Sequence, residues 1–259
     1  MDMGRGRKVY SMKERGQMIP KYIHYCWFGP KEIPEIGKKC IESWKKNMPD
    51  YTIICWSEKN FDVESNDFTK KAYRDGQYAF VSDYVRLKAL YDYGGIYMDI
   101  DEEVLKNFDD LLENREIVAC FENNQSVMVG LLAAAKASSL IKTFLERYHH
   151  IEGEVKYIAN PVIFTELLQK EKNLKLTGQY QELDHGRIAI FPNEYFCGYD
   201  FSVYKDNITA NTYAIQRYAG TWTNGKSMRS KKAHELLVNC VGERNYLRIK
   251  KIWKWIKRC

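Results

Sequence analysis

The sequence predicts an α/β fold with a mostly parallel sheet, because short apolar strands alternate with amphipathic helices along the chain. Hydrophobic residues make up 45% of the 259 residues, which is enough for a core and excludes a disordered chain. No composition shift or linker divides the body. We therefore expect one folded domain over residues 18–242, preceded by a disordered, polar leader over residues 1–17.

The predicted strands are apolar runs, and the predicted helices repeat apolar residues every three or four positions. The strands are expected at residues 22–28, 51–56, 96–100 and 117–121, and the helices at residues 35–47, 80–92, 138–149 and 161–170. Asn160 is the expected cap of the last helix. Gly94 and Gly95 stop the second helix, and we expect them to let the backbone approach a ligand closely.

The net charge of +6 is concentrated at the C-terminal end of the chain. Residues 244–258 contain seven Lys or Arg and no acid, so the rest of the chain carries −1. Nucleic-acid binding would call for a basic face on the body, and we expect no such partner. The seven Cys include no Cys-x-x-Cys pair, and their odd number argues against a disulfide framework. A reducing, cytoplasmic location is the expectation.

The tail over residues 243–259 is predicted to be a basic amphipathic helix that contains tryptophans. Two interpretations are open. The helix lies in the interface of an anionic membrane and makes the protein peripheral there, or it packs on the body with a solvated basic face. No apolar run in the sequence approaches the length of a membrane span.

The most informative stretch, SDYVRLKALYDYGGIYMDID, ends in the acids Asp99 and Asp101. Residues two apart in a strand face the same side, so we expect both carboxylates and Tyr97 to face one space at the strand end. Paired carboxylates suit Mg²⁺ or Mn²⁺. On its own, an Asp-x-Asp pattern more often marks a solvated strand end than a metal site. Asp83 and Arg86, which share one face of the preceding buried helix, favour a binding site, although a simple ion pair between them is the competing interpretation.

These residues resemble the signature of glycosyltransferase family 32. The opening IPKYIHYCWFG resembles the first strand of that family, and the resemblance covers residues 18–222. It implies a GT-A fold and a transfer that retains the configuration of the sugar. It further implies that Trp27 stacks on the nucleobase and that Asp83 and Arg86 contact the donor sugar. By the same resemblance, Asp99 reaches the ribose and metal-bound water, and Asp101 is a direct metal ligand.

Residues 212–222 resemble the closing segment of the family, where bacterial members often have His-x-x-x-x-Ser-Trp. Gln216 stands at the His position and is the candidate third metal ligand. Thr221 replaces the Ser and is a candidate donor contact. Trp222 matches, and it joins Asp83 and Arg86 as a candidate catalytic residue. The strand at residues 126–133 often presents an Asn to the sugar in this family, but apolar residues occur at that point here.

The combined motifs predict a metal-dependent enzyme that uses Mn²⁺ or Mg²⁺ and a nucleoside diphosphate sugar, with UDP favoured over GDP. The expected acceptor is a glycan or lipid-linked oligosaccharide in bacterial surface polysaccharide synthesis. The alternative is a catalytically silent protein that binds sugar nucleotides or glycans. This alternative stays open because Gln216 stands at the position of the family's His. Phosphatases and nucleotidyltransferases also use paired acids. They are disfavoured because Asp99 lies deep in the chain, after a helix and a double Gly, and follows no Gly-Ser turn.

Overall fold

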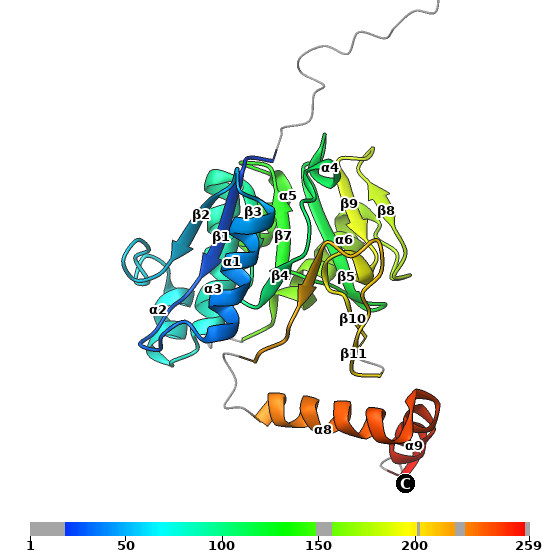
Figure 1. Ribbon diagram of the computed structural model, residues 1–259. Coiled ribbons are helices and arrows are strands. Elements are labelled where there is room, and N and C mark those ends of the chain that lie inside the picture. The colour runs from blue at the N-terminus through cyan, green and yellow to red at the C-terminus, as the bar shows by residue number, and fades with distance from the viewer. Residues whose placement is uncertain (1–18, 149–156, 201–202, 221–225, 257–259) are drawn as a thin grey trace, which may run out of the picture.

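The computed structural model describes residues 19–148, 157–200, 203–220 and 226–256, and Figure 1 shows their arrangement. The predicted leader, Thr221 and Trp222 lie outside the described residues. The strands are β1 (Tyr22–Cys26), β2 (Thr52–Trp56), β3 (Gly95–Met98), β4 (Glu102–Val104), β5 (Ile117–Asn123), β6 (Ser126–Val127), β7 (Leu131–Ala134), β8 (Gln181–Leu183), β9 (Ile188–Phe191), β10 (Tyr199–Asp200), β11 (Lys205–Asp206) and β12 (Ala214–Gln216). The helices are α1 (Glu35–Asn47), α2 (Asp67–Arg74), α3 (Tyr78–Tyr93), α4 (Asp109–Leu112), α5 (Ser139–Glu146), α6 (Asn160–Lys172), α7 (Asn193–Phe196), α8 (Lys226–Val241) and α9 (Glu243–Ile256).

The central sheet has the strand order β2-β1-β3-β7-β5-β9-β8, and β6 pairs with β5. Strands β2, β1 and β3 are parallel to one another, as are β5 and β9. Strand β7 runs antiparallel to β3 and to β5, and β8 runs antiparallel to β9. The predicted α/β fold with a mostly parallel sheet is therefore confirmed, because β2, β1, β3, β5 and β9 run in the same direction.

Both faces of the sheet are buried, and alternate side chains of β5 belong to the cores on the two faces. Ile117, Ala119 and Phe121 point into a core that the sheet shares with α2, α3, α5 and α6. Val118 and Cys120 point into the opposite core, shared with α1 and α7. A strand covered on both faces needs a continuous apolar run, which explains why no polar alternation marks these strands in the sequence.

Gly94 and Gly95, which follow α3, pack closely against backbone atoms of neighbouring segments. Gly94 and Gly95 have φ values of 69° and 110°, in the left-handed region that favours glycine. A Cβ on Gly95 would lie 2.6 Å from the Tyr22 carbonyl oxygen, and one on Gly94 would lie 2.6 Å from the Lys136 nitrogen. The buried His24 ring also hydrogen-bonds the Gly94 oxygen at 2.9 Å. Neighbouring backbone occupies the space that a side chain at either glycine would need, which gives both glycines a packing role.

Helix α9 lies where the basic amphipathic helix is predicted, and α8, absent from the predicted elements, precedes it (Figure 1). The two helices contact the β10–β11 hairpin region. The Tyr204 ring stacks on the His234 imidazole with centroids 4.5 Å apart, and the Tyr246 hydroxyl hydrogen-bonds His234 Nδ1 at 2.8 Å. Tyr246 is buried by these contacts. No helix in the described part of the chain is both long and apolar enough to cross a bilayer.

Candidate functional site

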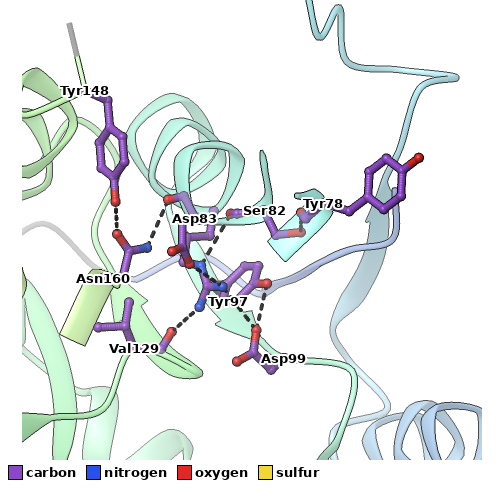
Figure 2. Close-up of polar contacts among 9 residues, drawn as sticks. Tyr78, Ser82, Asp83, Tyr97, Asp99, Val129, Tyr148 and Asn160 are labelled. Atoms are coloured by element: carbon purple, nitrogen blue, oxygen red, sulfur yellow. Dashed lines mark hydrogen bonds and ion pairs between the residues drawn. The ribbon is translucent and has the colours of Figure 1, made fainter. Parts of the chain in front are cut away.

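Asp83 and Arg86 lie one helical turn apart on α3, and Arg86 forms ion pairs with Asp83 and with Asp99, which follows β3; Figure 2 labels the two acids. Arg86 Nη2 lies 2.9 Å from Asp83 Oδ1 and 3.3 Å from Asp99 Oδ1. Arg86 Nη1 donates to the Val129 oxygen at 3.0 Å, and Nε donates to the Ser82 oxygen at 3.3 Å. The planar guanidinium thus joins α3, β3 and the β6–β7 connection, which is more than the simple ion pair considered from the sequence.

Tyr97 and Asp99 complete this network from β3. The Tyr97 hydroxyl donates to Asp99 Oδ1 at 2.9 Å, and the Arg86 guanidinium carbon lies 4.4 Å from the centre of the Tyr97 ring. The predicted proximity of Tyr97 to Asp99 is therefore observed. The Asp99 side chain keeps 31% of its surface exposed, whereas that of Arg86 keeps 8%. A ligand can therefore reach this network at Asp99.

Burial and neighbouring charges shift the pKa values of both Asp83 and Arg86. Burial raises the pKa of Asp83 to about 6, although the charge of Arg86 acts to lower it. Burial also acts to lower the pKa of Arg86, but the negative charge of Asp99 and of Asp83 outweighs it and leaves that pKa above its usual value. Arg86 therefore stays charged, while Asp83 titrates close to neutral pH.

Asn160 supports Asp83 from a distant part of the chain. Its side-chain nitrogen donates to the Asp83 carbonyl oxygen at 3.0 Å, and its side-chain oxygen accepts from the Tyr148 hydroxyl (Figure 2). The predicted role of Asn160 as a helix cap is wrong, because Ala159 is the N-cap residue and Asn160 is the first residue of α6. The sequence signal was misleading since Asn is common at caps for a local reason, whereas this Asn bonds across 77 residues.

The two predicted metal ligands are brought together by a turn and not by strand alternation. Strand β3 ends at Met98, and the Glu102 nitrogen donates to the Asp99 oxygen at 2.9 Å, so residues 99–102 form a turn. The expected strand to residue 100 is therefore too long. Asp101 Oδ2 accepts from the Ala219 nitrogen at 2.7 Å. Burial and the neighbouring charge of Asp99 raise the pKa of Asp101 to about 6.

Gln216 lies beside this turn because β12 pairs antiparallel with β4, which sets Gln216 opposite Glu102. With its nitrogen facing the acids, the Gln216 carboxamide donates to the Asp101 backbone oxygen, to Asp101 Oδ1 and to Glu102 Oε1, each at 3.2 Å. The opposite orientation would set an amide oxygen against three acceptors. The structure therefore brings Gln216 to the predicted acid pair, with its nitrogen toward the acids.

Glu102, which the sequence analysis does not single out, is the most buried acid of this turn. Its side chain is 0% exposed, and Oε2 has no hydrogen-bond partner among the described residues. Burial, followed by the charges of Asp101 and Asp99, raises the pKa of Glu102 well above its usual value. Its position directly after Asp101 was the available signal. Strand alternation would have sent it to the opposite face, and only the turn brings it to this side.

Gly130 packs closely against the acids, with no room for a side chain. A Cβ built on Gly130 would lie 2.9 Å from Asp99 Oδ2, 3.3 Å from Glu102 Oε1 and 3.4 Å from the Gln216 amide atom that is the oxygen in the orientation described above. Asp99 Oδ2 and the Gln216 amide oxygen thus converge beside this glycine, whereas Glu102 Oε1 accepts from the Gln216 nitrogen and Glu102 Oε2 has no partner among the described residues. A hard divalent cation fits this donor set.

The protein's own acids do not complete a cage for such a cation. In the part of the chain that the structure describes, no group of three or more His, Cys, Asp or Glu side chains is arranged to hold a metal ion alone. An ion here would take further oxygens from a bound phosphate or from water, as Mg²⁺ commonly does.

Trp27 directly follows β1, the parallel neighbour of β3, so it emerges at the same sheet edge as Asp99. Its ring is partly buried against the core on the α1 face, and Nε1 donates to the Lys31 oxygen at 2.6 Å. Met128 is buried in the same core, while Val129 contributes its carbonyl oxygen to Arg86. The connection between β6 and β7 thus contacts Arg86 through a backbone oxygen and not through a polar side chain.

Comparisons with known proteins agree with this geometry. The family model described as glycosyltransferase sugar-binding region containing DXD motif matches residues 34–118. Toxin Afp18 of Yersinia ruckeri is 30% identical over 204 residues, covering 59% of this chain and 9% of the toxin. The initiation-specific α-1,6-mannosyltransferase of Candida albicans is 24% identical over 174 residues, covering 63% of this chain and 45% of that protein.

A solved structure, PaToxG glycosyltransferase, superimposes with a TM-score of 0.49 at 25% identity, covering 62% of this chain and 71% of that one. The chain spans less than half the length of the two curated relatives that it matches. The matched region contains Asp83, Arg86 and the Asp99–Asp101 turn. The resemblance seen in the sequence is confirmed by the match of residues 34–118 to the model of the sugar-binding region that contains the DXD motif.

Proposed function

We propose that this protein is a retaining glycosyltransferase that moves a sugar from a nucleoside diphosphate onto a glycan or lipid-linked oligosaccharide acceptor. The observation that carries the proposal is the Arg86 guanidinium, which is fixed between Asp83 and the partly exposed Asp99 at the carboxyl end of β3. Ligands of open α/β sheets bind at this edge. The match of residues 34–118 to a sugar-binding region supports the same edge as the donor site.

In the proposed reaction the donor diphosphate lies over Asp99, Asp101 and Gln216, and Trp27 holds the base. A divalent cation, Mn²⁺ or Mg²⁺, would neutralise charge on the departing diphosphate. Arg86 is held in place before the donor binds, so its charge stabilises the developing phosphate charge without a reorganisation cost. Asp83 holds Arg86, and Trp222 is retained as a further contact of the leaving group.

Retention is proposed to proceed by attack on the face that the phosphate leaves. The bond from the sugar anomeric carbon to the phosphate oxygen breaks, and the acceptor oxygen bonds to the same carbon. The acceptor proton passes to the departing phosphate, so Asp83 is not required to act as a base. Thr221 is the remaining proposed donor contact.

The donor is proposed to be a UDP-hexose, and the acceptor to belong to bacterial surface polysaccharide synthesis. Mannose is a second sugar to test, because the Candida albicans relative is named a mannosyltransferase. The competing function is a silent protein that binds sugar nucleotides or glycans. Both functions predict ligand binding, and only the first predicts turnover.

The test pairs a binding measurement with a turnover measurement. Melting temperatures are recorded with UDP, GDP and their hexose conjugates, each with Mn²⁺ and with excess chelator, because a ligand of the folded state raises the melting temperature. Release of nucleoside diphosphate from the stabilising conjugate is then followed with and without acceptor oligosaccharides. Stabilisation without release would favour the silent protein, and the absence of any stabilising nucleotide would reject both functions.

The tail is proposed to hold the protein at the inner face of the cytoplasmic membrane, beside a lipid-linked acceptor. Support comes from the seven basic residues over positions 244–258, each worth about 1 kcal/mol near an anionic surface. Replacing Lys254, Lys257 and Arg258 by Gln should release the protein from anionic liposomes at low salt, whereas the native chain should sediment. Unlike a deletion, this change leaves the buried Tyr246 in place. Equal sedimentation of both proteins would favour a structural helix.

A further inference from the structure

Glu102 is a buried acid for which the proposed reaction has no role. Its side chain is 0% exposed, its Oε1 accepts from the Gln216 amide at 3.2 Å, and its Oε2 has no partner among the described residues. A buried acceptor without a partner is costly, and burying a carboxylic acid among other acids adds to that cost. A core position with no further task would be filled better by an apolar residue.

Glu102 cannot turn away from this environment. It begins β4, where it pairs with Gln216 of β12, and its backbone oxygen accepts from the Trp44 indole nitrogen at 2.7 Å. Trp44 is itself completely buried. The backbone on both sides of the carboxylate is therefore fixed by strand pairing and by α1.

Several acids act on the Glu102 carboxyl group. Asp99, Asp101 and Glu122 all act electrostatically on its carboxyl group. The buried guanidinium of the same region, Arg86, is already paired with Asp83 and Asp99. A divalent cation bound by Asp99 and by the Gln216 amide oxygen would compensate these acids.

The position of Gln216 indicates how Glu102 contributes. Two acceptors on Asp101 and one on Glu102 hold the amide nitrogen, which leaves the amide oxygen on the side of Gly130 and Asp99 Oδ2. When Asp101 Oδ1 serves a cation as a ligand, Glu102 Oε1 is the side-chain acceptor that still holds the amide nitrogen. Without Glu102, the Asp101 backbone oxygen would be the acceptor that is left from these three, and the carboxamide could reverse and present its nitrogen, which repels a cation.

We infer that Glu102 is a positioning residue of the divalent-cation site, which orients the Gln216 carboxamide so that its oxygen faces the cation together with Asp99. The inference rests on the proposed function, because it assumes that the site takes Mn²⁺ or Mg²⁺. It adds a specific coupling: the effect of Glu102 on the cation passes through Gln216.

The test measures Mn²⁺ affinity directly, by the electron paramagnetic resonance signal of free Mn²⁺, with UDP present and absent. Glu102→Leu should weaken Mn²⁺ binding by about 10- to 100-fold, the usual loss on removing a group that orients a metal ligand. Glu102→Gln keeps an acceptor oxygen and should lose less. Glu103→Gln is the matched control, since that neighbouring acid pairs with Arg217 and not with Gln216.

The coupling is tested by a double-mutant cycle. Gln216→Leu should weaken Mn²⁺ binding, and adding Glu102→Leu should cause no further loss, because the partner through which it acts is gone. A Glu102→Leu protein that is at least as thermally stable as the native chain yet binds Mn²⁺ poorly separates positioning from structural support. If this variant does not fold, Glu102→Ala carries the same prediction.

Two results would overturn the inference while leaving the proposed function intact. The first is native Mn²⁺ affinity in Glu102→Leu while Asp101→Asn loses it. The second is losses from Glu102 and Gln216 that simply add. Failure of the proposed function looks different, since the native protein would then bind no Mn²⁺ even with nucleoside diphosphates present, and the inference would fall with it.

Discussion

Asp101→Asn is expected to make the metal-free protein more stable and to remove its activity. The Asp101 carboxylate is buried, and its pKa is raised from 3.8 to about 6. Asn keeps an oxygen to accept from the Ala219 nitrogen, which now donates to Asp101 Oδ2 at 2.7 Å. An Asn nitrogen in place of Oδ1 cannot accept from Gln216, whose amide nitrogen keeps the backbone oxygen of residue 101 and Glu102 Oε1 as acceptors, so the variant loses a buried charge and one hydrogen bond.

The magnitude follows from the pKa of Asp101. A shift of about 2 units corresponds to about 3 kcal/mol, at 1.36 kcal/mol per unit. Because the folded state holds the proton more tightly than the unfolded state, the free energy of unfolding falls as the pH rises from about 4 to about 6. The Asn variant does not lose this stability as the pH rises, because its side chain does not ionise. Its advantage should therefore be near zero at pH 4 and reach about 3 kcal/mol above pH 7.

The assay is thermal unfolding in chelator across pH 4 to 8, where about 3 kcal/mol corresponds to a rise of roughly 6–12 °C for a domain of this size. Asp110→Asn, at an exposed position, is the control. Asp83 titrates in both proteins, so the difference between them reports Asp101 together with its electrostatic effect on Glu102. A variant that melts lower than the native protein at pH 7.5 in chelator would refute the reasoning, as would an advantage that does not change with pH.

Three further predictions concern the donor site. Trp27→Ala should weaken nucleotide binding by about 1–3 kcal/mol if the ring stacks on the base, and unchanged affinity in a destabilised protein would identify a core residue instead. Arg86→Lys keeps the charge but cannot bridge Asp83 and Asp99 together, so kcat should fall more than 10-fold while KM changes little, and native kcat would contradict this role. Gly130→Ala would set a methyl group 2.9 Å from Asp99 Oδ2, so calorimetry should detect weaker Mn²⁺ binding with little change in melting temperature; unaltered Mn²⁺ affinity would exclude a cation there.

The sequence alone determined the order of the main elements and the core of the site. Helix α1 begins and ends as predicted, because its apolar spacing and its basic last turn are local signals. Asp83 and Arg86 were also readable, since two residues three apart on an apolar helix must share a face. Signals of this kind depend on residues within one or two turns of one another, so they need no tertiary contact.

Only the tertiary structure decided which other groups join those residues. Asn160 reaches Asp83 from 77 residues away, and Val129 gives Arg86 a carbonyl oxygen that no side-chain pattern encodes. The turn at residues 99–102 brought Glu102 beside Gln216, because pairing of β4 with β12 pulls the chain out of β3 after Met98. Strand pairing between distant segments is a property of the whole sheet and is weakly marked in either segment. The sequence therefore indicated the acids of the site, while the pairing of distant strands set their geometry.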